Sequence, residues 1–235
     1  MTYSVISDYG QAVTFLKDKK KHLILFQTWI PEAKFIELLH DENGISISRQ
    51  DEGVYSLALG SRAPLRDHWE KISLERNSLW LSNREFTEQT DWEAHYLHYE
   101  EAPTFPLSEK RIDSEIGEFI KENAPDLSVF PGNKEIVHWS TLIGSENQLL
   151  GVAAICKWES GHHVIASVTT EKKLRGQGLG AKLVEVIKSD LANLEIKEVC
   201  LGVLSDNESA KKLYDRTGFE KLFDLRFVKN FNKLT

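Results

Sequence analysis

The chain has few cysteines, no long apolar run and no excess of positive charge. Only two of its 235 residues are cysteines, Cys156 and Cys200, which is too few for a disulfide framework and lacks the spacing of a metal site. Both lie in apolar runs, so we expect buried, reduced thiols and no bound metal. No stretch reaches the roughly 18 apolar residues of a membrane span, so we expect no membrane partner.

The charge balance is acidic, with 36 Asp and Glu against 29 Lys and Arg and a net charge of −7. This balance argues against a nucleic-acid partner, because nucleic-acid binding depends on the attraction of Lys and Arg side chains to the phosphate groups. Residues 1–10 show no basic segment followed by an apolar core, so we expect no signal peptide and a cytoplasmic location. Hydrophobic residues make up 41% and charged residues 28% of the chain, which indicates a folded globular protein of one large or two small domains.

The first part of the chain alternates helix-like and strand-like segments. Apolar residues at helical spacing predict a helix over residues 8–20, and a proline suited to a first helical turn predicts another over residues 31–40. Short apolar runs between glycine-rich breaks predict strands. The expected strands are residues 22–26, 45–49, 54–59 and 78–81.

Pro103 and Pro106 mark the clearest break, and we place a domain boundary near residue 95. The expected domains are residues 1–94, an N-terminal α/β region, and residues 95–235. In the second domain the patterns predict a strand over 95–99, a helix over 108–122, strands over 135–143, 149–158 and 164–169, a helix over 178–193, a strand over 196–204, a helix over 207–217 and a strand over 219–228. A hairpin followed by alternating strands and helices implies an α/β fold with a mixed sheet.

The sharpest local feature is the turn Arg175-Gly176-Gln177-Gly178-Leu179-Gly180-Ala181, which lies between a predicted strand and a predicted helix. Glycine permits a positive φ and lets a ligand approach the backbone. The first turn of the helix has unpaired N–H groups and the positive end of the dipole, which together favour a phosphate or pyrophosphate, and Arg175 adds a charged donor. The alternative is a tight turn that merely requires glycine.

Two better-known phosphate motifs do not fit this turn. The dinucleotide fingerprint requires G-x-G-x-x-G, whereas the spacing here is G-x-G-x-G. The nucleotide P-loop requires Lys followed by Ser or Thr after its last glycine, whereas Ala181 follows Gly180. A nucleotide-binding protein of either type is therefore disfavoured.

The segment from Arg175 to Gly180 resembles the R/Q-x-x-G-x-G/A signature of the GNAT superfamily of acyl-CoA-dependent N-acyltransferases. A second segment, residues 207–219, is similar to the N-x-x-A-x-x-L-Y-x-x-x-G-F helix of that family. The resemblance covers residues 95–235, and the residues of the two motifs are most similar to those of the glycine N-acyltransferase-like branch. Residues 1–94 match no motif, and one interpretation makes them a degenerate second copy of the same fold.

The resemblance implies a GNAT-like acyltransferase fold with an additional N-terminal α/β region. The implied activity is transfer of an acetyl group from acetyl-CoA to a primary amine of a small molecule or peptide. It also implies the cofactor-binding residues. Val168, Thr169 and Thr170 would offer backbone groups to the pantetheine arm, the amides of Arg175, Gly176, Gln177, Gly178, Leu179, Gly180 and Ala181 would hold the pyrophosphate, and Asn207 and Tyr214 would also contact the cofactor.

Tyr214 stands where the family commonly places a general acid, which protonates the departing thiolate. The alternative is a tyrosine packed on the buried side of its helix beside Leu213. The alternative for Asn207 is a role in starting the helix, because Ser205 and Glu208 have capping-box spacing.

The general base is the least defined group. Some members use a Glu upstream of the signature arginine, and His162 occupies that position here, with His163 beside it. Histidine titrates in the useful range, but adjacent strand residues point to opposite faces, so at most one of the two faces the site. The alternative is an exposed or structurally paired histidine. An acyl group carried on Cys156 or Cys200 is disfavoured, because direct transfer is the usual route in the family.

A non-catalytic acyl-CoA sensor is the alternative function. It would need the phosphate cradle but neither Tyr214 nor a base. We expect the acceptor to be selected by the N-terminal part and by the loop over residues 123–134. The sequence does not decide between a monomer and a homodimer.

Overall fold

The computed structural model describes residues 3–42, 44–51, 54–60, 78–82, 91–127 and 129–229. The chain divides into two compact units. Unit 1 comprises Met1–Ala94, Val203–Asn207 and Lys221–Thr235, and unit 2 comprises His95–Gly202 and Glu208–Glu220.

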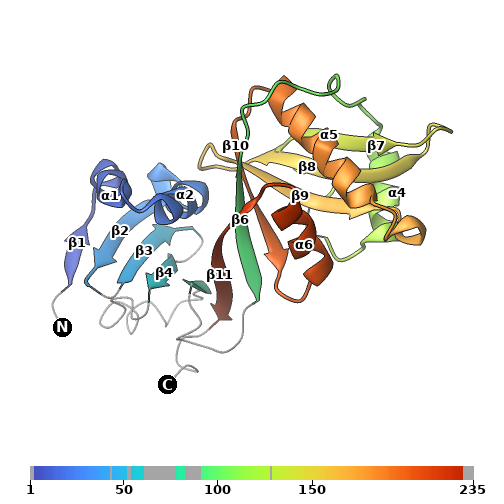
Figure 1. Cartoon of the computed structure of the whole chain (residues 1–235). Helices are drawn as coiled ribbons and strands as arrows, with labels where there is room; N and C mark the ends of the chain where they lie inside the picture. Colours follow the sequence, from blue (N-terminus) through green and yellow to red (C-terminus); the bar gives the residue numbers. More distant parts are fainter. Residues whose placement is uncertain are drawn as a thin grey trace. The chain divides into compact units, whose positions relative to one another are not determined.

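Unit 1 is a sheet accompanied by two helices, drawn mainly in blue in Figure 1. Its elements are β1 (Ser4–Ile6), α1 (Tyr9–Leu16), α2 (Lys20–Trp29), the 3-10 turn η1 (Glu32–Lys34), β2 (Phe35–His40), β3 (Gly44–Gln50), β4 (Val54–Gly60), β5 (Ser78–Ser82) and β11 (Glu220–Lys229). The strands follow the order β1-β2-β3-β4-β5-β11. Strands β2, β3 and β4 form an antiparallel meander, and β4 then pairs with β5 in parallel.

Helix α1 begins where the sequence provides a cap. The Asp8 carboxylate accepts a hydrogen bond from the Gln11 amide at 2.8 Å, which satisfies one of the open donors of the first turn. The apolar side of the helix then buries Ala12 and Leu16. Phe26 of α2 stacks on Tyr9 with ring centroids 4.8 Å apart, so the two helices share one apolar layer.

Two predictions in unit 1 are wrong. Residues 22–26, predicted as a strand, belong to helix α2, and residues 31–40, predicted as a helix, form η1 and strand β2. A continuous apolar run does not distinguish a buried helix from a strand. Neighbouring Leu38 and Leu39 of β2 are both buried, so the strand is covered on both faces and lacks the alternation that marks a half-exposed strand.

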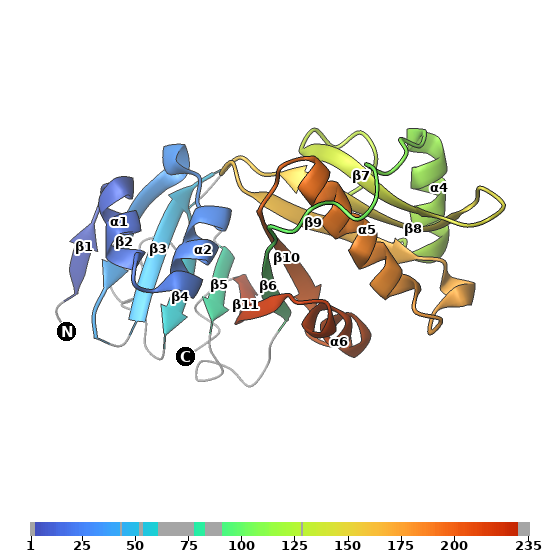
Figure 2. The same cartoon turned by 45° about the horizontal axis from the view of Figure 1, so that its top comes forward.

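Unit 2 contains the rest of the chain, drawn from green to red in Figures 1 and 2. Its elements are β6 (Trp92–His98, shared with unit 1), α4 (Asp113–Asn123), β7 (Ile136–Ile143), β8 (Leu149–Lys157), β9 (His163–Thr170), the 3-10 turn η2 (Lys172–Leu174), α5 (Leu179–Asn193), β10 (Glu198–Leu204) and α6 (Glu208–Arg216). The strand order is β6-β10-β9-β8-β7. The elements predicted beyond residue 135 are all present within one or two residues of their predicted ends. The mixed sheet and α/β class are therefore confirmed.

Helices α4 and α5 cover opposite faces of the unit 2 sheet. Adjacent residues on a strand point to opposite faces, and a Cβ on Gly151 of β8 would meet Leu183 of α5 at 3.2 Å. The next residue, Val152, packs instead with Ile116 and Ile120 of α4. The helix predicted over residues 108–122 begins only at Asp113, and the preceding residues run as an extended segment.

Strand β9 changes partners along its length. His163–Ile165 pair in parallel with Val199–Leu201 of β10, and that described pairing ends there. On the other side, the register with β8 passes from Ala154↔Ala166 to Val152↔Thr169, so two residues of β9 oppose one of β8. This is a β-bulge, which bends a strand. Beyond it, one edge of β9 is left without a described strand partner.

None of the helices in the described part of the chain combines the length and apolarity needed to cross a membrane.

Candidate functional site

The predicted phosphate cradle is the loop of residues 175–181 at the start of α5. Gly176 and Gly178 both have φ of +81°, and Gly178 is the N-cap of α5. A Cβ built on either glycine would meet nothing within 4 Å. No described atom accepts a hydrogen bond from the amides of residues 176–181. The loop therefore presents open donors to open space at the positive end of a helix.

Glycine is required at the three positions of this loop for two different structural reasons. Gly176 and Gly178 take a left-handed backbone that side chains rarely adopt. Gly180 lies inside α5, and a Cβ there would come within 3.0 Å of Leu213 Cδ2 in α6. Gly180 thus permits α5 and α6 to pack closely, which keeps α6 next to the cradle.

Arg175 has a partner that the sequence pattern did not reveal. Its Nη2 donates to the backbone carbonyl of Asn123, the last residue of α4, at 2.8 Å. The Asn123 side chain is buried, and its Oδ1 accepts from the Lys172 amide at 2.7 Å. An asparagine at the end of an amphipathic helix carries no sequence signal for such a contact, so only the structure identifies it.

Val168, Thr169 and Thr170 lie on the part of β9 beyond the described pairing with β10. Ser167 and Val168 form the bulge opposite Ala153, and the φ of Ser167 is +51°. Ser167 Oγ donates to the Val129 carbonyl at 2.7 Å, which holds the bulge to the loop that follows α4. Val168–Thr170 therefore have an open strand edge, and the strand leads directly into η2 and the cradle.

Tyr214 lies on α6 and is buried, with its ring 5.9 Å from that of His95 and 5.3 Å from that of Phe219. Its hydroxyl makes no hydrogen bond to a described residue. Burial raises the pKa of Tyr214 to about 12, so the phenol keeps its proton at neutral pH. Both interpretations offered by the sequence, a packed tyrosine and a proton donor, are compatible with this position.

His162 lies in the turn between β8 and β9, directly before the residues of β9 that pair with β10. Its Nδ1 is buried and has no hydrogen-bond partner among the described residues. His163, the first residue of β9, has its pKa lowered by burial and then by the charge of Lys157. No described contact links His162 to the cradle or to α6.

Asn207 precedes α6, which begins at Glu208. Its amide donates to the Leu204 carbonyl at 3.0 Å, so the backbone turns here before the helix starts. Asn207 is exposed. The role of its side chain stays a prediction.

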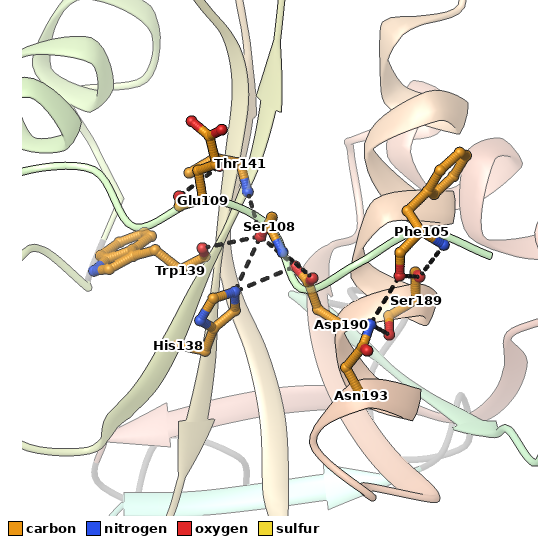
Figure 3. Close-up of polar contacts among 9 residues, drawn as sticks. All are labelled: Phe105, Ser108, Glu109, His138, Trp139, Thr141, Ser189, Asp190 and Asn193. Carbon is orange, nitrogen blue, oxygen red and sulfur yellow. Dashed lines mark hydrogen bonds and ion pairs between the residues drawn. The ribbon is translucent and has the colours of Figure 1, made fainter. Parts of the chain in front are cut away.

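A cluster of Ser108, His138 and Asp190 joins three segments of unit 2 (Figure 3). Ser108 Oγ donates to Asp190 Oδ2 at 2.6 Å and lies 3.0 Å from His138 Nε2. His138 Nε2 is also 3.4 Å from Asp190 Oδ2. A nucleophilic serine must give its proton to the imidazole, whereas this hydroxyl donates to the carboxylate.

This cluster fastens an extended segment to α5. The Ser108 amide also donates to Asp190 Oδ1 at 2.8 Å. The preceding residue of α5, Ser189, makes two more bonds to the segment: its Oγ donates to the Phe105 carbonyl and accepts from the Phe105 amide, both at 2.7 Å. Burial favours the protonated Asp190, but the bonds from His138 and Ser108 outweigh it, and the pKa of this carboxyl is lowered. The cluster is therefore a structural anchor, and nothing in the sequence spacing predicted it.

Both cysteines are free and buried. Burial, and then the charge of Glu135, raises the pKa of Cys156 to about 11. Cys156 and Cys200 lie on the two strands that flank Val164, so about 10 Å separates them across two strand spacings. This is too far for a disulfide. The described residues also contain no group of three or more side chains suited to a metal ion.

Comparison with protein-family models identifies the class of protein. The model of the acetyltransferase (GNAT) family matches residues 92–219, more than half of the chain. The chain therefore belongs to the GNAT acetyltransferase family, which is a family of acyltransferases that use acyl-CoA as co-substrate and act on small-molecule or peptide acceptors. No curated protein gave a significant match.

Solved structures share the fold over nearly the whole chain. A GCN5-related N-acetyltransferase from Kribbella flavida has a TM-score of 0.53 at 15% identity, with 94% of this chain and 95% of that chain covered. A GNAT-family acetyltransferase from Colwellia psychrerythraea has a TM-score of 0.52 at 13% identity, covering 98% and 100%. A GCN5-related N-acetyltransferase from Sphaerobacter thermophilus has a TM-score of 0.51 at 14% identity, covering 96% and 94%. None of these findings assigns the chain to the glycine N-acyltransferase-like branch.

Proposed function

We propose that the protein is an N-acetyltransferase that moves an acetyl group directly from acetyl-CoA to a primary amine. The observation that carries this proposal is the cradle of residues 175–181. The amides of residues 176–181 have no described acceptor, the left-handed glycines open onto free space, and the loop leads into the start of α5. A diphosphate fits these features, because backbone N–H groups at a helix N-terminus favour an anion.

The strand that leads into the cradle supports a thioester carrier over a simple phosphate ligand. Residues Val168–Thr170 lie beyond the described pairing with β10. An extended arm with amide groups could add to this edge as a further strand would, through main-chain hydrogen bonds. The pantetheine arm of CoA has this chemistry and is attached to the diphosphate.

The proposed reaction requires two proton movements. The amine nitrogen forms a bond to the thioester carbonyl carbon, and the carbon–sulfur bond breaks. Tyr214 then gives its proton to the departing thiolate, and its buried phenol carries that proton at neutral pH. The amine must itself lose a proton, and His162 is the proposed base, because its buried Nδ1 makes no hydrogen bond to a described residue.

Direct transfer is supported by the state of the cysteines. Cys156 is buried and its pKa is raised to about 11, so almost none of it is thiolate at neutral pH. A ping-pong route through Cys156 would need that thiolate. We therefore propose that amine and thioester meet in one complex.

We further propose that residues 1–94 form a degenerate GNAT-like half and residues 95–235 the acyltransferase domain. The strand pattern supports this interpretation. In unit 1, antiparallel strands β2, β3 and β4 precede a parallel β5. In unit 2, antiparallel β7, β8 and β9 precede a parallel β10. The sequence between β4 and β5, residues 61–77, lacks the R-x-x-G-x-G signature.

The decisive experiment combines binding with turnover. Acetyl-CoA should raise the melting temperature of the protein, because a ligand that binds only the folded state stabilises it. Purified protein should then release CoA thiol from acetyl-CoA when a panel of amines is supplied. Binding without release on any amine would favour the non-catalytic acyl-CoA sensor, and absence of binding would reject both functions.

A further inference from the structure

We propose that Asn123 is a positioning residue that holds the cradle for the diphosphate of CoA. The proposal rests on the function proposed above and adds a residue outside the family motifs. Asn123 is the last residue of α4 and is only 4% exposed. It lies far from the cradle in the sequence, yet it contacts both ends of the 3-10 turn η2 that leads into it.

The first contact is at the start of η2. Asn123 Oδ1 accepts from the Lys172 amide at 2.7 Å, while its Nδ2 donates to the Phe119 carbonyl at 2.9 Å, one turn back in α4. One partner requires an acceptor and the other requires a donor, so both amide atoms are used. An aspartate could satisfy only the first partner, and an alanine neither.

The second contact is at the end of η2. The Asn123 backbone carbonyl accepts from Arg175 Nη2 at 2.8 Å. Open carbonyls at the end of a helix carry partial negative charge, which favours a nearby guanidinium. Because Arg175 has five N–H donors, this bond fixes the side chain and leaves most of its donors for an anion.

A third contact ties the same region to β9. Ser167, at the bulge, donates to the Val129 carbonyl at 2.7 Å. The chain that leaves α4 is therefore bound both to the bulge that starts the open edge of β9 and to the turn that opens the cradle. This arrangement makes the end of α4 a support for the two parts of the proposed CoA site.

The chain offers a matched control at the end of the other long helix. Asn193 is the last residue of α5, and its Nδ2 donates to the Ser189 carbonyl at 2.8 Å, again one turn back. Its second bond goes to the Phe105 carbonyl at 2.9 Å and not to the cradle. Asn193→Ala therefore removes a helix-end amide with the same bond one turn back, here an exposed one, without touching η2.

The test is isothermal titration calorimetry with CoA on the full chain. Asn123→Ala should raise the Kd for CoA about tenfold, which is the value of one hydrogen bond, with unchanged stoichiometry. A merely structural loss would instead lower the stoichiometry, because part of the protein would be unfolded. Asn193→Ala should leave Kd within about twofold.

A second variant covers the case in which Asn123→Ala fails to fold. Asn123→Asp keeps the oxygen that accepts from Lys172, so it should bind CoA more tightly than Asn123→Ala does and within about threefold of the natural chain. An unchanged Kd for Asn123→Ala, or an equal loss in both Asn123 variants, would overturn the positioning role alone. Failure of the natural chain to bind CoA would overturn the proposed function as well.

Discussion

The two sheets of this protein have the same strand pattern but differ in how their parallel strands pair. In unit 1, β4 pairs with β5 over Ser56–Leu59, almost to its end at Gly60. In unit 2, β9 pairs with β10 only over His163–Ile165, although the strand continues to Thr170. The contrast teaches that the same strand pattern can serve as scaffold in both units, whereas the open strand edge on which the proposed binding site depends is found in unit 2.

The two units also differ in their backbone conformation. All described residues with a positive φ, including Ser167, Gly176 and Gly178, lie in unit 2. A non-glycine residue in this region costs of order 1–3 kcal/mol and persists where the surroundings enforce it. Three of these residues, Ser167, Gly176 and Gly178, belong to the bulge and the cradle, so part of the left-handed backbone of unit 2 lies at the proposed site.

The strongest test of this contrast is Gly178→Val. A β-branched side chain at φ +81° strains the loop and fills the open space of the cradle. We expect CoA affinity to fall by about 100-fold or more, measured by calorimetry. Gly161→Val is the matched control, since Gly161 has φ +86° and open space but lies in the β8–β9 turn. Equal losses in both variants would assign the effect to strain and not to the cradle.

The next largest effect is expected from Tyr214→Phe. Loss of the proton donor should lower turnover by about 100-fold while the Kd for CoA changes less than about twofold. Steady-state kinetics and calorimetry measure the two quantities. Tyr96→Phe serves as control, because Tyr96 is also buried in unit 2 but donates to Glu198 at 2.9 Å. Normal turnover in Tyr214→Phe would remove this residue from the chemistry.

Asp190→Asn tests a part of unit 2 that the proposed chemistry does not use. Removing the charge that accepts bonds from Ser108 should lower the free energy of unfolding by about 2 kcal/mol at pH 7. The folded pKa of Asp190 lies below its ordinary value of 3.8, so its stabilisation is present above pH 3.8 and is lost as the pH falls through the folded pKa. In urea unfolding, the difference in the free energy of unfolding between the natural chain and Asp190→Asn should therefore be smaller at pH 3 than at pH 7. A pH-independent difference would contradict this account.

The smallest effect is expected from unit 1. Asp51 pairs with Lys34 at 2.5 Å and with Arg49 at 2.7 Å, and Asp51→Asn should cost about 1 kcal/mol or less. The Kd for CoA and a stoichiometry of one CoA per chain should stay unchanged. A second equivalent of bound CoA, or a large loss of affinity in this variant, would give unit 1 a binding role and weaken the contrast.

The sequence predicted unit 2 better than unit 1 for a physical reason. Turn residues such as Gly161 and the capping Gly178 separate the elements of unit 2, and residues of α5 such as Leu183 and Ile187 follow helical spacing into the core. In unit 1, α2 and β2 are apolar on several sides, so periodicity did not distinguish helix from strand.

The left-handed backbone of the cradle and its place at the start of α5 were predictable, because they depend on glycines that lie close together in the chain. The contacts of Asn123 and the cluster of Ser108, His138 and Asp190 were not predictable, because they join residues brought together only by the fold. Each of these side chains also has an unremarkable local sequence. Contacts of this kind become visible only in the tertiary structure.

The burial of both cysteines has a practical consequence for measuring this enzyme. Cys156 and Cys200 are 0% and 3% exposed, so a thiol-reactive dye added to the native protein should give almost no background. Colour that develops during a reaction then reports the free coenzyme. On unfolding, the same dye should reveal two further thiols per chain, which gives an independent count of how much protein in each preparation was folded.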